Sequence, residues 1–241
     1  MNRNFLFDLD QTLLDFHASE KKALEIVLKA NGISYSQEVY AHFKEINKTL
    51  WLKLEKQEIT RQELFTIRFT DIFEKYGGGT ENFDPLKVNS EFIKTMSING
   101  VLMDGALELV QKIKSEIKDS RIYIVSNGAT INAEGRIKST GLEKFLDGLF
   151  ISEAMGVAKP APEFFDMVFE KIRGPKDSCI MIGDSLTSDM LGAKNAGLDS
   201  VWFMPQGNQQ EIESAVKEYD IDFCAENFAD LLNVLKKWSR Q

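Results

Sequence analysis

The chain has 241 residues, of which 43% are hydrophobic and 27% are charged, as is usual for a globular protein. Its formal net charge of -8 argues against a protein that binds the phosphate backbone of nucleic acids. No apolar run approaches the roughly 20 residues that span a bilayer, and the N-terminus lacks the pattern of a secretory signal. We therefore expect a cytoplasmic protein without membrane or nucleic-acid partners, built as one large domain or as a core domain with an insertion.

Two carboxylates directly follow the first predicted strand. The apolar run 5–7 reads as a strand, and Asp8 and Asp10 come next. Side chains alternate along an extended chain, so the two carboxylates share one side if the strand continues. Like charges this close repel each other, so either a cation neutralises them or one of them carries a proton. The pair favours a metal site or an acid/base pair.

The segment 16–99 is predicted to be helical throughout. Strand signals are nearly absent from it, and helices are expected at 20–30, 37–55, 60–76 and 90–97. An all-helical block between the first strand and the later strands indicates an insertion. We therefore place a core domain at 1–15 and 100–241, and a helical cap domain at 16–99.

After residue 100 the pattern alternates between helix and strand. Helices are expected at 104–118, from Pro162 onward, at 189–196 and at the end of the chain, and strands at 121–125, 149–152, 178–182 and 200–204. Repeated strand and helix units imply a parallel sheet that is covered on both faces. The predicted fold class is α/β, with a doubly wound, Rossmann-like sheet as core.

Three later predicted strands also end in polar residues. Asp184 and Asp189 follow the strand 178–182, and a functional role is favoured for Asp184, whereas Asp189 could equally cap the next helix. Ser126 and Asn127 follow the strand 121–125 and could hold a phosphate oxygen or only form a turn.

Lys159 lies in the loop after the strand 149–152, immediately before Pro160. A lone loop lysine is usually solvated, but together the four strand ends offer four carboxylates and one ammonium group. Mg²⁺ prefers carboxylate, carbonyl and water oxygens and bridges proteins to phosphate groups. A lysine supplies a compact positive charge to a phosphoryl oxygen. The combination predicts a magnesium-dependent site for phosphate chemistry.

The two cysteines, Cys179 and Cys224, each lie in an apolar stretch. We expect both to be small buried hydrophobic residues without a disulfide bond.

This arrangement of motifs resembles the haloacid dehalogenase (HAD) superfamily of phosphohydrolases. The matching residues are Asp8-Leu9-Asp10-Gln11-Thr12, Ser126-Asn127, Lys159-Pro160 and Gly183-Asp184 through Asp189. The resemblance spans nearly the whole chain, and the helical block matches the superfamily's helical cap in kind and position.

The resemblance implies a role for each residue at the strand ends. Asp8 would be the nucleophile that forms an aspartyl-phosphate, and Asp10 would protonate the leaving oxygen and then deprotonate the attacking water. Dehalogenases of the superfamily generally lack this second Asp, so phosphatase chemistry is favoured.

The resemblance also implies the ligands of the metal and of the phosphoryl group. Mg²⁺ would be held by Asp8, the backbone carbonyl of Asp10 and Asp184, with Asp189 supporting through water or Lys159. Ser126, Asn127 and Lys159 would bind the phosphoryl group.

Substrate choice is expected to lie in the helical block. Residues 47–51 and 54–61, Leu64 and Arg68-Phe69 look similar to the cap of house-cleaning pyrimidine 5′-nucleotidases of this superfamily. Trp51 could stack on a base and Arg68 could reach its polar edge. Alternatively, Trp51 packs between helices and Arg68 lies on the surface.

The predicted function is therefore hydrolysis of a small phosphate ester, most specifically a nucleoside 5′-monophosphate. A sugar-phosphate or phosphoglycolate phosphatase and a phosphoglucomutase are alternatives on the same scaffold. An alternative of another class is a signalling receiver or a non-catalytic phosphate-binding protein. Receivers, however, have roughly half this length and no inserted helical block.

Overall fold

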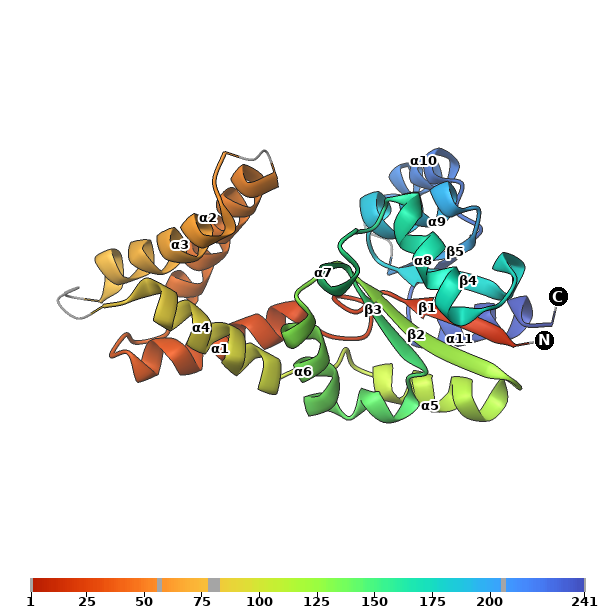
Figure 1. The fold of residues 1–241 in the computed structure, drawn as a ribbon, viewed down its shortest axis with the longest axis horizontal. Helices are drawn as coiled ribbons and strands as arrows, with labels where there is room; N and C mark the ends of the chain where they lie inside the picture. The colour runs from red at the N-terminus through yellow and green to blue at the C-terminus, as the bar shows by residue number, and fades with distance from the viewer. Residues whose placement is uncertain (1, 56–57, 78–82, 205–206, 241) are drawn as a thin grey trace. The chain divides into compact units, whose positions relative to one another are not determined.

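A computed structural model describes residues 2–55, 58–77, 83–204 and 207–240 of the chain (Figure 1). The chain forms two compact units, one made of Met1–Phe16 with Gly100–Gln241 and the other of His17–Asn99. We call the first the α/β unit and the second the helical unit.

The α/β unit is built on one all-parallel sheet of six strands within the described residues. The strands are β1 (Arg3–Phe7), β2 (Ser120–Ser126), β3 (Gly148–Ile151), β4 (Cys179–Gly183), β5 (Asp199–Phe203) and β6 (Phe223–Ala225). Their order across the sheet is β3-β2-β1-β4-β5-β6. The predicted doubly wound α/β fold is confirmed.

The strand order reverses direction at the centre of the sheet. From β1 the chain builds outward through β2 and β3 on one side, then returns to β4, β5 and β6 on the other. Doubly wound sheets bind ligands outside the carboxyl ends of the strands at this switch point. Here that position lies at the carboxyl ends of β1 and β4.

The strands bury both of their faces because alternate side chains point to opposite sides of the sheet. Phe5 and Phe7 enter one apolar cluster, whereas Leu6 between them enters the other. The first cluster includes side chains of α5 (Ala106–Glu116), α6 (Thr130–Thr140) and α11 (Phe228–Trp238). The second includes those of α8 (Pro162–Ile172), α9 (Leu191–Ala196) and α10 (Gln209–Tyr219). Helices therefore cover both faces of the sheet (Figure 1).

Short helical turns complete the α/β unit. They are α7 (Ser152–Met155), the 3₁₀ turns η1 (Leu142–Phe145) and η2 (Lys176–Ser178), and the π-helical turn η3 (Leu186–Met190).

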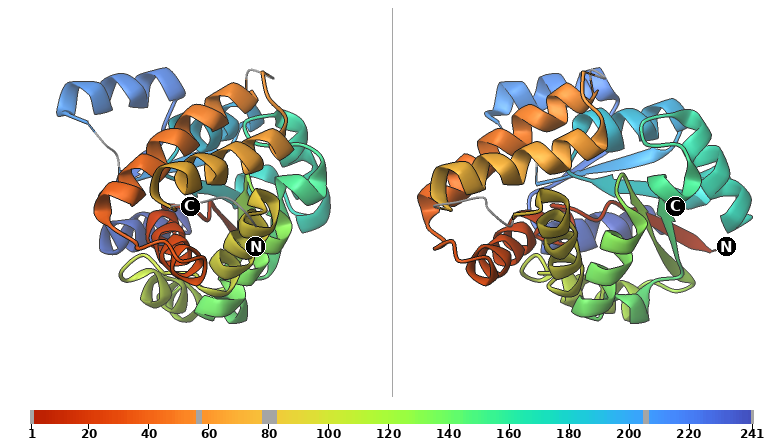
Figure 2. Two further views of the ribbon diagram at one scale, coloured as in Figure 1. Left: turned by 90° about the vertical axis from the view of Figure 1, so that its left-hand side faces the viewer. Right: turned by 60° about the vertical axis from the view of Figure 1, so that its left-hand side comes forward.

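The helical unit consists of α1 (Phe16–Ala30), α2 (Gln37–Glu55), α3 (Arg61–Tyr76) and α4 (Pro85–Ile98). Helices α2 and α3 lie side by side (Figure 2). Three phenylalanines from α2, α3 and α4 meet with ring centroids 5.6 to 5.9 Å apart; they are Phe43, Phe69 and Phe92. These aromatic rings form the core that joins the three helices.

Several predicted elements differ from the observed ones. The helix predicted at 90–97 begins earlier, at Pro85, because Asp84 caps its first turn and proline suits that position. The helix predicted at 189–196 begins later, at Leu191, since residues 186–190 form the turn η3, which Ser185 caps. Helices α6 and α10 and strand β6 lie where no element was predicted.

Both cysteines are free. The predicted burial is confirmed for Cys179 and is wrong for Cys224, which is exposed. Cys224 lies on the edge strand β6, between two residues that face the first apolar cluster, so its own side chain points the other way. Among the helices of the described ranges, none is both long and apolar enough to cross a membrane.

Candidate active site at the carboxyl edge of the sheet

The predicted strand-end residues gather at the carboxyl edge of the sheet. Asp8 directly follows β1, Ser126 ends β2 and Asp184 directly follows β4. The backbone N–H of Asp8 donates to the carbonyl of Ile182 at 2.8 Å and so continues the pairing of β1 with β4. The carboxylates of Asp8 and Asp184 are thus held on neighbouring strands.

Lys159 connects several groups of the site through its ammonium group. Its side chain is completely buried, and Nζ lies 2.7 Å from Asp8 Oδ1 and 2.6 Å from Asp189 Oδ1. The third proton of the ammonium group is donated to the carbonyl of Val125 at 2.6 Å. All three donors of the lysine are therefore used, and the alternative of a solvated loop lysine is excluded.

Asn127 contacts the main chain of Lys159 with both ends of its amide. Its Nδ2 donates to the Lys159 carbonyl at 2.8 Å, and its Oδ1 accepts from the Lys159 N–H at 2.9 Å. This reciprocal pair joins the loop after β2 to the loop that carries the lysine. Ser126, the neighbouring residue, is only 3% exposed at the end of β2.

Asp189 is fully buried, and both of its carboxylate oxygens have protein donors. Oδ1 accepts from Lys159, and Oδ2 accepts from the backbone N–H of Ser185 at 3.1 Å. Its carboxylate packs on Gly183, where a Cβ atom would lie 2.2 Å from Oδ2. Glycine is therefore required at position 183. Because Ser185 caps the following turn, the alternative of Asp189 as a helix cap does not hold.

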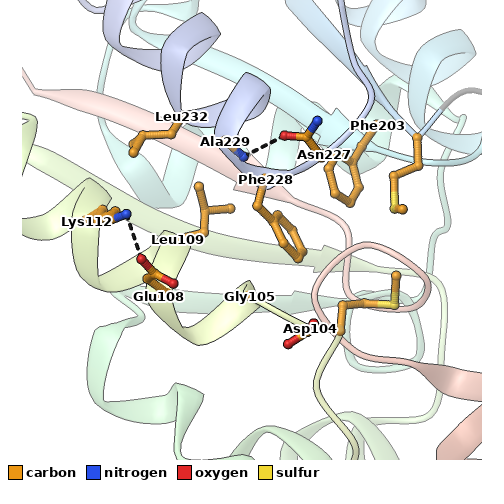
Figure 3. A pocket seen from close by; sticks show the side chains of 12 residues that line it. Asp104, Gly105, Glu108, Leu109, Lys112, Phe203, Asn227, Phe228, Ala229 and Leu232 are labelled. Carbon is orange, nitrogen blue, oxygen red and sulfur yellow. Dashed lines mark hydrogen bonds and ion pairs between the residues drawn. The ribbon is translucent and has the colours of Figure 1, made fainter.

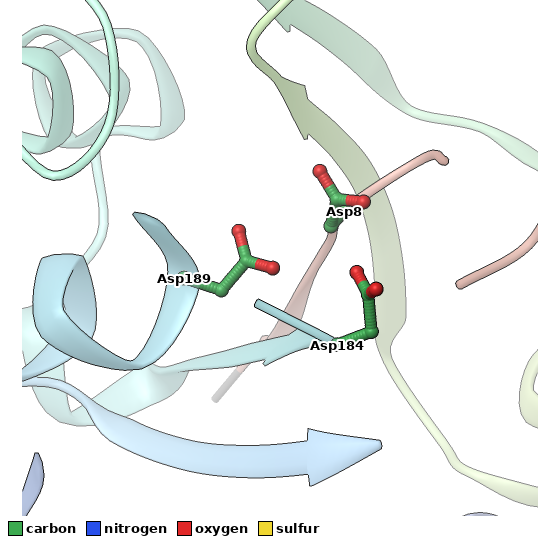
Figure 4. Close-up of side chains that lie close together, drawn as sticks. All are labelled: Asp8, Asp184 and Asp189. Atoms are coloured by element: carbon green, nitrogen blue, oxygen red, sulfur yellow. The ribbon is translucent and has the colours of Figure 1, made fainter. Parts of the chain in front are cut away.

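Three carboxylates form an acidic trio at this edge (Figure 4). One oxygen from each of Asp8, Asp184 and Asp189 lies within 4.8 Å of the others. Burial raises the pKa of Asp8 to about 8, although Lys159 opposes the rise. Burial and the charge of Asp189 raise the pKa of Asp184 to about 6.

The lysine is strongly held in its charged form. Burial alone would lower the pKa of Lys159, but the carboxylates of Asp189 and Asp8 outweigh burial and raise it. One ammonium group shared by two carboxylates leaves the trio with excess negative charge. Burial is the main cause of the raised pKa values of Asp8 and Asp184, and the negative charge of Asp189 adds to it; a divalent cation would offset that charge. The donor set, all carboxylate oxygens, fits Mg²⁺.

Asp10 does not join the trio. Its carboxylate forms an ion pair with Arg136 of α6, in which Nη1 donates to Oδ1 and Nη2 donates to Oδ2, the latter at 2.9 Å. Arg136 is only 3% exposed. Arg136 is not among the site residues that the sequence motifs predicted. The available signal was a single arginine between Ala133 and Ile137, two residues on the buried side of the helix.

The two candidate substrate residues lie in the helical unit. Trp51 on α2 is 38% exposed, so its ring is not part of the aromatic core. Arg68 on α3 is 3% exposed; it donates from Nε to Asn89 Oδ1 at 3.1 Å and from Nη1 to Asn47 Oδ1 at 3.2 Å. The alternative of a surface Arg68 is therefore wrong, and its contact with a substrate stays a prediction. Within the stretch 54–61, residues 56 and 57 lie outside the described ranges.

A buried carboxyl group accompanies this arginine. Glu20 of α1 is 3% exposed and accepts from the Tyr40 hydroxyl at 3.4 Å. Burial raises the pKa of Glu20 to about 7, and the positive charge of Arg68 limits the rise.

A separate surface pocket of about 320 Å³ lies between α5, β5 and α11 (Figure 3). Leu109, Phe203 and Phe228 line it, with the ion pair of Glu108 and Lys112 at 2.7 Å. None of the predicted site residues lines this pocket.

A doubly wound sheet with an acidic trio and a buried lysine at its carboxyl edge is the framework of an α/β enzyme. The chain matches the haloacid dehalogenase-like hydrolases over residues 3–197, and it belongs to that family. The resemblance seen in the sequence motifs is confirmed.

Two relatives named as pyrimidine 5′-nucleotidases are similar over most of their length. The pyrimidine 5′-nucleotidase PynA of Streptococcus pneumoniae is 34% identical over 233 residues, which is 96% of this chain and 94% of PynA. The pyrimidine 5′-nucleotidase YjjG of Escherichia coli is 32% identical and covers 85% of this chain and 87% of its own.

A solved structure is also similar throughout. The crystal structure of the HAD-hydrolase YfnB from Bacillus subtilis, bound to magnesium, has a TM-score of 0.80 and 30% sequence identity. The similarity covers 97% of this chain and 98% of YfnB.

Proposed function

We propose that this protein is a magnesium-dependent phosphomonoesterase that hydrolyses nucleoside 5′-monophosphates through a phosphoryl group carried on Asp8. The observation that carries the proposal is the buried Lys159, which bridges Asp8 and Asp189 beside Asp184. This arrangement supports a site in which Asp8 would be the nucleophile, Lys159 would supply a positive charge to the phosphoryl group and carboxylate oxygens would bind the metal.

The metal would be held by Asp8, Asp184 and the backbone carbonyl of Asp10. Both oxygens of Asp189 already accept from protein donors, so Asp189 supports the site through Lys159. When bound, Mg²⁺ neutralises the trio and the phosphoryl oxygens, which lets a carboxylate approach a phosphate ester. The main chain that carries the Asp184 carboxylate is also held, because Trp202 donates its indole N–H to the backbone carbonyl of Asp184 at 2.9 Å.

The chemistry proceeds in two displacements at phosphorus. An Asp8 oxygen bonds to phosphorus while the ester bond breaks, and Asp10 gives its proton to the leaving oxygen. Asp10 then takes a proton from the water that attacks phosphorus, which releases phosphate and regenerates Asp8. Ser126 would hold a phosphoryl oxygen, and the positive charge of Lys159, whose three N–H groups already have protein acceptors, would stabilise the negative charge that develops. Asn127 contributes by fixing the main chain of Lys159.

This requirement for a proton argues against dehalogenation. A departing halide needs no proton, whereas an alkoxide does, and Asp10 is present to supply one. Membership of a hydrolase family also removes the basis for a signalling or non-catalytic protein.

We assign substrate selection to the helical unit, as a cap domain, with Trp51 and Arg68 as its candidate residues. Support for a nucleotide comes from two relatives named as pyrimidine 5′-nucleotidases, at 34% and 32% identity. A sugar-phosphate phosphatase is the second candidate, because the glyceraldehyde 3-phosphate phosphatase of Pyrococcus furiosus is 34% identical over 55% of this chain.

A panel of phosphate esters tests the proposal. With Mg²⁺, nucleoside 5′-monophosphates should rank above sugar phosphates and phosphoglycolate in kcat/KM, and Asp8→Asn should abolish release from every ester. A reversed ranking replaces the nucleotide with a sugar phosphate and leaves the chemistry intact. Phosphate release by Asp8→Asn at the wild-type rate overturns the proposed chemistry. Transfer of the phosphoryl group to a second sugar, without release of phosphate, indicates a mutase.

A further inference from the structure

Arg136 is a buried arginine whose guanidinium group forms an ion pair with the carboxylate of Asp10. It is 3% exposed, while the Asp10 side chain is 30% exposed. Both terminal nitrogens donate, one to each carboxylate oxygen. Two parallel hydrogen bonds of this kind fix the direction of a carboxylate as well as its rotation.

The guanidinium group is itself held from two sides. On its own helix, Nε lies 3.4 Å from the carbonyl of Asn132. On the other side, its Cζ atom lies 5.5 Å from the centre of the Phe16 ring. The backbone N–H of Phe16 donates to Gln11 Oε1 at 2.8 Å, which anchors that ring next to the loop that carries Asp10. The position of Arg136 is therefore set by α6 and by the chain that follows Asp10.

The main chain around Asp10 is already fixed without the arginine. The N–H groups of Leu13 and Leu14 donate to the Leu9 carbonyl at 3.0 and 2.8 Å, and the Gln11 N–H donates to the Leu14 carbonyl at 2.7 Å. The freedom left to Asp10 is rotation of its short, partly exposed side chain. Arg136 removes that freedom.

We propose that Arg136 is a positioning residue for Asp10, which fixes the carboxyl group where it can reach the leaving oxygen of the substrate. The proposal rests on the proposed function, in which Asp10 gives its proton to that oxygen as the bond from phosphorus to Asp8 forms. When Asp10 carries its proton, one of its oxygens keeps its hydrogen bond from Arg136, and the other gives up its own and holds the proton. Arg136 itself contacts neither the phosphoryl group nor the leaving group.

This role has a signature that a merely structural role lacks. An alkoxide, such as the 5′ oxygen of a nucleoside, needs a proton to leave, whereas p-nitrophenolate leaves readily without one. Loss of Arg136 should therefore slow formation of the phosphoenzyme from an alkyl phosphate and spare that from p-nitrophenyl phosphate. The ratio kcat/KM reports the steps up to this point.

The experiment compares kcat/KM for the best alkyl phosphate of the panel and for p-nitrophenyl phosphate. Arg136→Met should lower the first by about 100-fold, the cost of a misplaced catalytic group, and leave the second nearly unchanged. Arg136→Lys keeps the charge but not the two-pronged contact and should give a selective loss of about tenfold. Lys138→Met, which removes an exposed positive charge from the same helix, should change neither.

Asp10→Asn is the reference variant. If it loses activity equally with both esters, the acid role of Asp10 in the proposed function is wrong, and the role of Arg136 falls with it. If Asp10→Asn is selective but neither Arg136 variant is, the proposed function stands and the proposal for Arg136 is overturned. Retained turnover of p-nitrophenyl phosphate shows that a variant is folded. If Arg136→Met does not fold, Arg136→Lys tests the proposal alone. A selective loss of kcat/KM with the alkyl phosphate supports it, and an equal effect on both esters overturns it.

Discussion

Replacing Lys159 with methionine removes the ammonium group that bridges the acidic trio and changes the volume of the side chain little. The lysine and Asp189 side chains are 0% exposed and that of Asp8 is 12% exposed, so no water replaces the lost partner readily. Removing one partner from a buried ion pair costs about 3 to 5 kcal/mol, because the remaining charge is left unpaired. We expect Lys159→Met to destabilise the α/β unit by that amount.

The matched control is Lys114→Met. Lys114 pairs with Asp147 near the surface, where the two side chains are 28% and 33% exposed. Ion pairs in such positions contribute about 0 to 1 kcal/mol. The two variants thus remove the same group from a buried site and from a hydrated one.

The assay is urea unfolding followed by tryptophan fluorescence in a Trp51→Phe background, which leaves only Trp202 and Trp238, both in the α/β unit. It is run once with a chelator and once with Mg²⁺. Without the lysine the trio lacks a buried positive charge, so Mg²⁺ should stabilise Lys159→Met more than it stabilises the wild type. Phosphatase activity should fall about 100-fold or more, as for loss of a group that stabilises developing charge. A Lys159→Met protein that is as stable as Lys114→Met would refute the reasoning.

Three further predictions concern single side chains. Asn127→Ala removes two hydrogen bonds to the main chain of Lys159 and should cost about 2 kcal/mol in urea unfolding, with a lower kcat. Trp202→Phe removes the donor to the Asp184 carbonyl and should weaken Mg²⁺ binding about tenfold or more, measured by titration of activity. For Glu20, burial raises the pKa from 4.5 to about 7, so between these values the folded state binds more protons than the unfolded state. Glu20 should therefore make stability fall as pH rises through this window, by at most about 3 kcal/mol. Because the raised pKa values of Asp8 and Asp184 act in the same direction, Glu20→Gln should reduce the fall between about pH 4 and about pH 8, not abolish it. A slope that Glu20→Gln shares with the wild type would contradict the assignment.

The gathering of the site residues was predictable because it depends on topology. Asp8, Ser126 and Asp184 each stand at the end of an apolar run, and parallel strands bring such ends to one edge of a sheet. The side-chain period of two residues also places Phe5 and Phe7 on one face and Leu6 on the other. These features follow from short patterns in the chain.

The partners of those residues were not predictable in the same way. Arg136 is 126 positions from Asp10, and it lies on a helix whose sequence contains Gly135 and three β-branched or hydroxyl residues near its end, which weaken the helical pattern. Asn127 suggested a ligand of phosphate, yet its amide contacts the main chain of Lys159, a contact that no spacing reveals. Long-range contacts of this kind depend on the packed fold.

The central claim is that Asp8 carries the phosphoryl group during turnover. An acyl phosphate is reduced by borohydride to an alcohol, so an aspartyl-phosphate is converted to homoserine at its position in the chain. After the enzyme is quenched during turnover with its best substrate and Mg²⁺ and then reduced, peptide sequencing by mass spectrometry should find homoserine at position 8. The conversion should be absent without substrate and in Asp8→Asn. Homoserine at another aspartate, or none while phosphate is being released, would contradict the account.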